Sequence, residues 1–292
     1  MKKQRIKDFA EDLLDTLVTI LRIILFSRKK VSLPTPPKSS TKCNILANGP
    51  SLTESINRFK DYILKRTNFA VNYFAFSSFY CEIKPSYYVL IAPEFWMAEP
   101  PSRRHKENRE ALFRTLSQQT NWEMNLFIPF EASKSKLIQK LLNNHKFIRI
   151  FCFNSSPVEG FRFFRHLAFK HKLGMPRPHN VLIPSIYLAV TMGFKEIYLF
   201  GADHSWHEEI KINDTNKVTV NHQHFYDKGE LRLPMYKLDG QEYYMHDILR
   251  KLYLAFKGYF ILKDYAEYLG AKIYNASVRS YIDAFEKIKI NV

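Results

Sequence analysis

The chain has few cysteines, and no motif brings them together. Its 292 residues contain only Cys43, Cys81 and Cys152, an odd number at wide spacing without a CxxC pair. This pattern is typical of a reducing compartment and argues against a disulfide framework or a thiolate zinc site. We therefore expect all three cysteines to be core residues.

Long apolar runs are also missing. A helix that spans a bilayer needs about 20 mainly apolar residues, whereas the most apolar stretch, residues 13–26, is shorter and contains Asp15 and Arg22. Neither the uninterrupted apolar region nor the small-residue cleavage site of a secretory signal is visible near residue 1. We therefore expect no spanning helix and no secretory signal.

Signatures of nucleic-acid-binding modules are absent as well. Lys and Arg outnumber Asp and Glu by 44 to 28, a formal net charge of +16, which favours nucleic acid, an acidic membrane leaflet or a phosphorylated substrate as partner. The basic residues are scattered, and no RNA-binding, zinc-finger or basic-zipper motif accompanies them. We expect no nucleic acid as a partner.

What the chain does have is apolar material for a large core. Hydrophobic residues make up 46% of the sequence and aromatic residues 15%. This composition predicts a globular protein, and the length suits one core domain with an inserted lid.

Residues 1–30 have the pattern of an amphipathic helix between two basic clusters. Apolar and polar residues recur on opposite sides at three- and four-residue spacing. The apolar set is Phe9, Leu13, Leu17, Ile20, Leu21, Ile24 and Leu25, and the polar set is Asp8, Glu11, Asp12, Asp15, Thr19 and Arg22. We expect this helix to lie in an anionic membrane interface, peripheral at the cytoplasmic face of the inner membrane. The alternative is packing on the protein's own core or on another subunit of a homo-oligomer.

Residues 31–42 are rich in Pro, Ser and Thr and contain almost no large apolar side chain. This composition predicts an extended, mobile linker between the helix and a domain of residues 43–292.

A buried strand is predicted over residues 43–47, followed at once by a turn with Asn48 and Gly49. Ser51 and Glu54 have the spacing of a capping box, so we expect a helix to start at Ser51. Such a strand, turn and helix aim backbone N–H groups at a phosphate beyond the strand end, and Gly49 would permit close approach. The alternative is an ordinary strand-to-helix connection.

Further strands are predicted over residues 69–74, 87–91, 196–200 and 272–274, with helices over 180–192, starting near Pro184 and ended by Gly193, and 248–269. Asn72, Asp203 and Asn275 lie at ends of these strands, and Ser277 leads into an expected terminal helix. The pattern predicts an α/β, Rossmann-like, mostly parallel doubly wound sheet with a polar ligand-binding rim.

Residues 204–246 are polar and aromatic with little regular periodicity, which predicts an inserted lid. His-x-x-His and His-x-His spacings in this segment leave a zinc or manganese site as one alternative. The ligands would come from Asp203, His204, His207, His222 and His224.

The pairing of ILANGPSL (residues 45–52) with GFKEIYLFGAD (residues 193–203) resembles bacterial sialyltransferases of the Campylobacter type. It is also similar to the wider superfamily that holds motility-associated glycosylation factors and MptE-like pterin diphosphokinases. The resemblance covers about residues 43–285 and implies a glycosyltransferase domain with a lid at about residues 204–246.

The resemblance implies that Asn48, Gly49, Ser51 and Asn72 hold a CMP-activated sugar, and Asp203, Asn275 and Ser277 join them as donor-binding candidates. His246 matches the family's general base, and His204, His207, Tyr226, Tyr243 and Tyr244 are lid candidates. Ala92 stands where the family has an asparagine, which leaves the donor open.

The implied reaction transfers a sialic-acid-like or Kdo-like sugar to a lipid-linked or cell-surface glycan, without a cofactor or metal. The alternatives are an MptE-like diphosphokinase, a metal-dependent nucleotide-sugar transferase and a non-enzymatic scaffold for polysaccharide assembly.

Overall fold

The computed structural model describes residues 2–100, 102–142, 145–221, 232–234 and 241–290. Within them, eight strands form one sheet in the order β11-β10-β6-β1-β2-β3-β4-β5, and every pair of neighbours is parallel. The strands are β1 (Lys42–Leu46), β2 (Thr67–Val71), β3 (Tyr87–Val89), β4 (Met124–Pro129), β5 (Ile148–Phe153), β6 (Glu196–Phe200), β10 (Lys272–Asn275) and β11 (Glu286–Lys287). The predicted α/β, Rossmann-like fold is confirmed.

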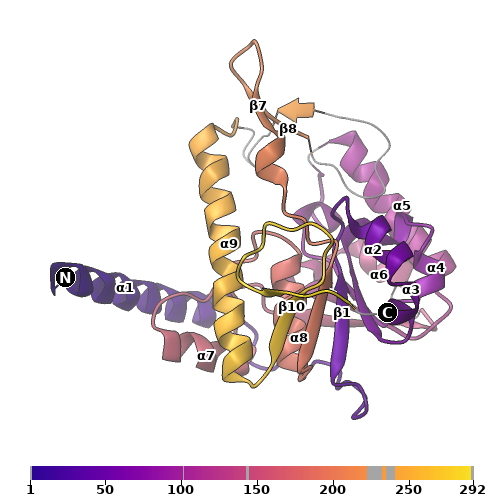
Figure 1. Cartoon of the computed structure of the whole chain (residues 1–292), viewed down its shortest axis with the longest axis horizontal. Helices are drawn as coiled ribbons and strands as arrows, with labels where there is room; N and C mark the ends of the chain where they lie inside the picture. The colour runs from indigo at the N-terminus through magenta and orange to yellow at the C-terminus, as the bar shows by residue number, and fades with distance from the viewer. Residues whose placement is uncertain (1, 101, 143–144, 222–231, 235–240, 291–292) are drawn as a thin grey trace.

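Helices cover both faces of this sheet (Figure 1). In β6, Ile197 and Leu199 belong to one apolar cluster, while Tyr198 and Phe200 belong to the other. The first cluster includes residues of α8 (Leu182–Met192) and α9 (Met245–Tyr268); the second includes residues of α2 (Leu52–Arg58), α5 (Arg103–Gln119) and α6 (Lys136–Leu142). The short helix α3 (Lys60–Leu64) precedes β2 in the sequence, and the short helix α4 (Tyr80–Ile83) lies between β2 and β3.

The chain reverses its direction of travel across the sheet at β1. From β1 it proceeds outward through β2, β3, β4 and β5, then crosses back to place β6 on the other side of β1 and continues to β10 and β11. In doubly wound sheets this reversal opens a crevice at the carboxyl ends of the two diverging strands, where ligands bind.

Several predicted boundaries move. Helix α8 starts at Leu182, because the Oδ1 atom of Asn180 accepts from the backbone N–H groups of Leu182 and Ile183, which leaves Pro184 in the first turn. The expected stop at Gly193 is confirmed, with φ at 104°. The terminal helix after Ser277 is wrong: residues 276–285 have no helix, and the chain returns to the sheet as β11.

The segment expected to be an irregular lid contains a small antiparallel sheet. Its strands are β7 (Ile210–Ile212), β8 (Val218–Asn221) and β9 (Arg232–Pro234), preceded by a 3-10 turn at Trp206–Glu209. Val218 and Val220 pack with Ile248 of α9, so the insertion is attached to the amino-terminal part of that helix (Figure 1).

The first helix, α1 (Lys2–Phe26), packs against the domain at its carboxyl-terminal half and extends away from it (Figure 1). In the part of the chain that the structure describes, no helix combines the length and apolarity needed to cross a bilayer. Residues 31–41 have no regular structure, and Leu33 packs against the core.

The cysteines are only partly as expected. All three are free thiols; Cys43 is buried and Cys152 half-buried, but Cys81 is exposed on α4. The prediction of a core position is therefore wrong for Cys81, because the short helix α4 turns this side chain to the surface.

Candidate functional site

A cavity of about 330 Å³ lies at the carboxyl ends of β1, β2, β3 and β6 and at the amino terminus of α8. This is the topological switch point of the sheet. Its lining residues are 47–50, Asn72, 91–93, 178–182, Gly201, 203–206 and Glu209. Of the residues singled out from sequence, the cavity brings together Asn48, Gly49, Asn72, Asp203 and His204.

Two asparagines offer unpaired amide oxygens at this cavity. Asn48 donates its Nδ2 group to the carbonyl oxygen of Val71 at 3.1 Å, and its Oδ1 atom is buried without a partner. The Oδ1 atom of Asn72 is equally buried and unpaired, and a positive φ of 44° turns the backbone at that residue. A buried acceptor without a donor is costly, and both asparagines line the cavity.

The carboxylate of Asp203 is hydrogen-bonded to Ser51, the residue before α2, although Asp203 also lines the cavity. Its carboxylate accepts from the backbone N–H of Ser51 at 3.2 Å and from the Ser51 hydroxyl at 2.9 Å. Burial raises the pKa of Asp203, although the hydrogen bonds from Ser51 act in the opposite direction. Ser51 itself is buried, and both of its donors serve the protein.

The predicted capping box is therefore wrong. Helix α2 does follow Ser51, but the Ser51 side chain makes no capping hydrogen bond; it is turned toward Asp203, to which its hydroxyl donates. Gly49 also has a role that the sequence did not reveal: a Cβ there would lie 2.9 Å from Cγ of Asp203 and closer still to Oδ2. The residue at this position must lack a Cβ because Asp203 and Gly201 of the same chain pack directly against it.

Two cavity residues were missed by the sequence reasoning, His179 and Asn180. Asn180 caps α8 with its Oδ1 atom, and its Nδ2 group is buried without a partner. Asparagine just before an apolar run is a preferred capping residue, so this type could have indicated Asn180. The Nε2 atom of His179 is also buried and unpaired; burial, followed by the charges of Arg177 and Lys251, lowers the pKa of His179 to about 4.

A hydrogen-bonded chain runs from His204 through Tyr259 to Asn180. The Tyr259 hydroxyl donates to Oδ1 of Asn180 at 3.1 Å, and the same hydroxyl is bonded to Nε2 of His204. Since a hydroxyl has one proton, His204 must donate from Nε2. Burial lowers the pKa of His204 to about 3, so at neutral pH the ring is the neutral imidazole with its proton on Nε2.

The remaining predicted residues do not line the cavity. His246 lies in the first turn of α9 with its side chain 81% exposed and stacks on Tyr244; Tyr243 accepts from Lys251, and His207 packs against Tyr281. Asn275 and Ser277 act behind the cavity, where Ser277 accepts from the backbone N–H of Ala202 at 2.9 Å. Tyr226 lies outside the described residues.

A metal site was the other use suggested for the His-rich segment. No group of three or more His, Cys, Asp or Glu side chains arranged to hold a metal ion occurs among the residues with a described placement. His222 and His224, which completed the suggested set, lie outside them.

No family model matches this chain, and no curated protein matches it. Among solved structures, the MAf glycosyltransferase from Magnetospirillum magneticum AMB-1 is similar, with a TM-score of 0.50 and 12% identity. The similarity covers 90% of this chain and 35% of that chain, so this chain spans about a third of the neighbour's length. At this identity the similarity shows that the two chains share a fold, and it identifies neither a reaction nor a sialyltransferase type.

Proposed function

We propose that the chain is a glycosyltransferase that binds a nucleotide-activated sugar in the cavity at the β1–β6 switch point. The observation that carries the proposal is the pair of buried, unpaired amide oxygens of Asn48 and Asn72, which share this cavity. A nucleotide supplies matching donors in its base and ribose. The fold shared with a known glycosyltransferase supports the same reaction class.

The donor proposed is a CMP-activated, sialic-acid-like or Kdo-like sugar, since Asn48 and Asn72 are two of the residues on which the resemblance to sialyltransferases depends. The amino terminus of α8 faces the same cavity through Asn180 and Val181, and its dipole favours a phosphate there. The proposed acceptor is a lipid-linked or cell-surface glycan, and the reaction uses no metal.

The titration that tests this proposal uses CMP, CDP, UDP and GDP, each with and without EDTA. CMP should bind regardless of EDTA, and Asn48→Ala should weaken it by about tenfold, the equivalent of about 1.4 kcal/mol for one lost hydrogen bond. Asn57→Ala, on the exposed side of α2, is the matched control and should bind as the wild type does. Binding of a diphosphate only, and only with metal, would favour a diphosphokinase or a metal-dependent transferase.

His246 is the proposed general base, which takes the proton from the acceptor hydroxyl. We expect His246→Ala to lower kcat by about 10² to 10⁴ while the donor KM stays unchanged, because the base acts only in the transition state. His171→Ala, which replaces an exposed histidine directly after α7 (Arg162–Lys170), is the control. Wild-type kcat in His246→Ala, together with a loss in His179→Ala, would transfer the role to the histidine that lines the cavity.

A further inference from the structure

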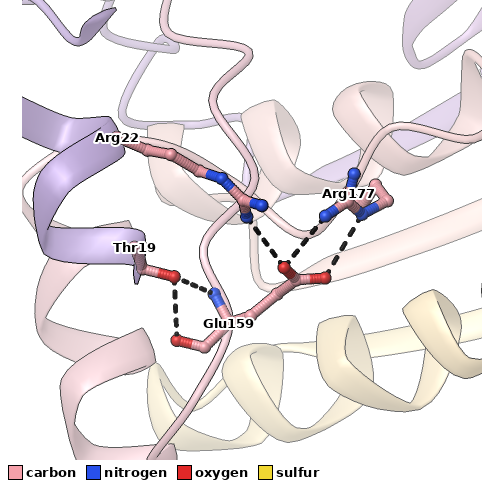
Figure 2. A network of polar contacts seen from close by, with 4 residues as sticks. All are labelled: Thr19, Arg22, Glu159 and Arg177. Atoms are coloured by element: carbon pink, nitrogen blue, oxygen red, sulfur yellow. Dashed lines mark hydrogen bonds and ion pairs between the residues drawn. The ribbon is translucent and has the colours of Figure 1, made fainter. Parts of the chain in front are cut away.

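Helix α1 is attached to the domain through its polar side. The Thr19 hydroxyl bonds to both the carbonyl and the backbone N–H of Glu159, and Arg22 donates to the Glu159 carboxylate at 2.9 Å (Figure 2). Thr16 accepts from the backbone N–H of Phe161 at 3.0 Å. Both threonines are buried, so these contacts form a fitted interface.

The same interface continues along the helix. A Cβ on Gly160 would lie 2.6 Å from the backbone nitrogen of Thr16, so helix and loop are in close contact. Beyond the helix end, Ser27 donates to Ser156 at 3.0 Å, and Asn154 bonds to the backbone of Arg28 in both directions. Helix α1 is therefore held against the domain at several points along its carboxyl-terminal half.

Most of the apolar side of α1 is exposed within the described chain, although Phe9 lies with its ring 5.3 Å from that of Phe161 and Ile23 packs against the core. Ile24 is 73% exposed and Phe26 69%, and the other exposed apolar residues of the helix are Ile6, Phe9, Leu13, Leu14, Leu17, Val18, Ile20, Leu21 and Leu25. The helices of globular proteins ordinarily bury their apolar side against the core. In α1 most of this side faces away from the core instead.

The acidic and basic residues of α1 and its flanks lie at different places on the helix. Asp12 and Asp15 line a cleft of about 90 Å³ between the helix and the domain, which Arg165, Arg177 and Lys257 also line. Exposed basic residues flank the apolar side at both ends: Arg5 and Lys7 at the start, and Arg28, Lys29 and Lys30 after the end.

We propose that the exposed apolar side of α1 is a docking surface for an anionic lipid bilayer, with the helix lying flat in the interface. A helix with an apolar face and basic flanks binds such a surface by burying the apolar face among the acyl chains while anionic headgroups neutralise the flanks. A second copy of the chain fits less well, because parallel and antiparallel pairing of two α1 helices both place basic ends beside basic ends.

The polar attachment also connects this surface to the cavity. Glu159 is bonded to Arg22 of α1 and to Arg177, whose guanidinium donates at 2.9 and 3.2 Å (Figure 2). Arg177 lies two residues before His179 at the cavity rim. A bilayer bound to α1 thus holds the cavity at a set position relative to the lipid, which suits an acceptor carried on a membrane.

The test is co-sedimentation of the full chain with vesicles of phosphatidylcholine alone or with a quarter of phosphatidylglycerol. We expect binding only to the anionic vesicles, and at least about a tenfold loss of it in Leu17→Glu/Leu21→Glu. Leu64→Glu/Leu249→Glu, which changes two exposed leucines on α3 and α9, is the matched control and should bind as the wild type does.

Other outcomes would overturn the proposal. Equal binding to neutral vesicles, or wild-type binding by Leu17→Glu/Leu21→Glu, would show that the face and its flanks are not the docking surface. A dimer in analytical ultracentrifugation that dissociates in this variant, without vesicle binding by the wild type, would assign the face to a second copy. CMP titration of the same variant should match the wild type, so a failure here is separate from a failure of the proposed function.

Discussion

Replacing Gly49 by alanine should abolish nucleotide binding and destabilise the chain by about 3 kcal/mol, the upper range for overpacking a close-packed interior. The added Cβ would lie 2.9 Å from Cγ of Asp203 and nearer to its Oδ2 atom and to the carbonyl oxygen of Gly201. Neither neighbour is free to move, because Asp203 is held by Ser51 and Gly201 accepts from the backbone N–H of Gly49 at 2.9 Å.

Urea unfolding and the CMP titration measure the two effects of this change. Gly270→Ala is the matched control: its φ of 66° is positive but a Cβ would meet nothing within 4 Å, so it should cost only about 1 kcal/mol of backbone strain and leave nucleotide binding intact. If Gly49→Ala kept wild-type stability and binding, the turn after β1 could shift away from Asp203, and the packing argument would be wrong.

Replacing Glu159 by alanine should loosen α1 from the domain and lower the free energy of unfolding by about 2 kcal/mol, in the range for hydrogen bonds to charged groups. The change leaves Arg22 and Arg177 beside each other without the carboxylate that bridges them. Hydrogen exchange of the α1 amides and thermal unfolding measure the effect. Glu123→Ala, which removes the exposed pair with Arg149, should change stability by less than about 1 kcal/mol.

The same carboxylate predicts a pH dependence. Burial acts to raise the pKa of Glu159, but hydrogen bonds and charge from Arg177, and then from Arg22, outweigh it and lower the pKa below its ordinary value. The stabilisation is therefore complete above the unfolded pKa of about 4.3 and is lost as pH falls through the lower, folded pKa. Glu159→Gln should lack this part of the acid sensitivity. Identical acid transitions in wild type and variant would show that Glu159 does not hold α1 in place.

The predicted parts of the fold are those with a local cause. After Glu196, the residues 197–200 of β6 are all apolar because both faces of the strand are covered, and this run of large apolar side chains is visible in the sequence. Gly193 ends α8 because glycine, which has no Cβ, adopts the positive φ of 104° without steric strain. The error at Ser277 arose because the turn Asn275-Ala276-Ser277 resembles a helix start, whereas the chain there is directed by contacts with Ala202 and Asp203.

The candidate site was only partly predictable, because some of its contacts have no local cause in the sequence. Asn48, Asn72 and Asp203 could be placed at one edge because they follow parallel strands. That Asp203 would bond to Ser51, 152 residues away, has no local signature. The position of His179 has no local signature either, because this residue lines the cavity only as a result of where the segment before α8 lies relative to the sheet.

By itself, the sequence determined the parallel α/β architecture, the strand ends that carry polar residues and the amphipathic character of residues 1–30. Each of these follows from the spacing of apolar and polar residues that are close together in the chain. Only the tertiary structure decided which side of α1 meets the domain, what occupies the backbone N–H of Ser51 and which histidines reach the cavity. These depend on contacts between segments more than 100 residues apart, and periodicity describes which side of a segment is apolar but not which partner it meets.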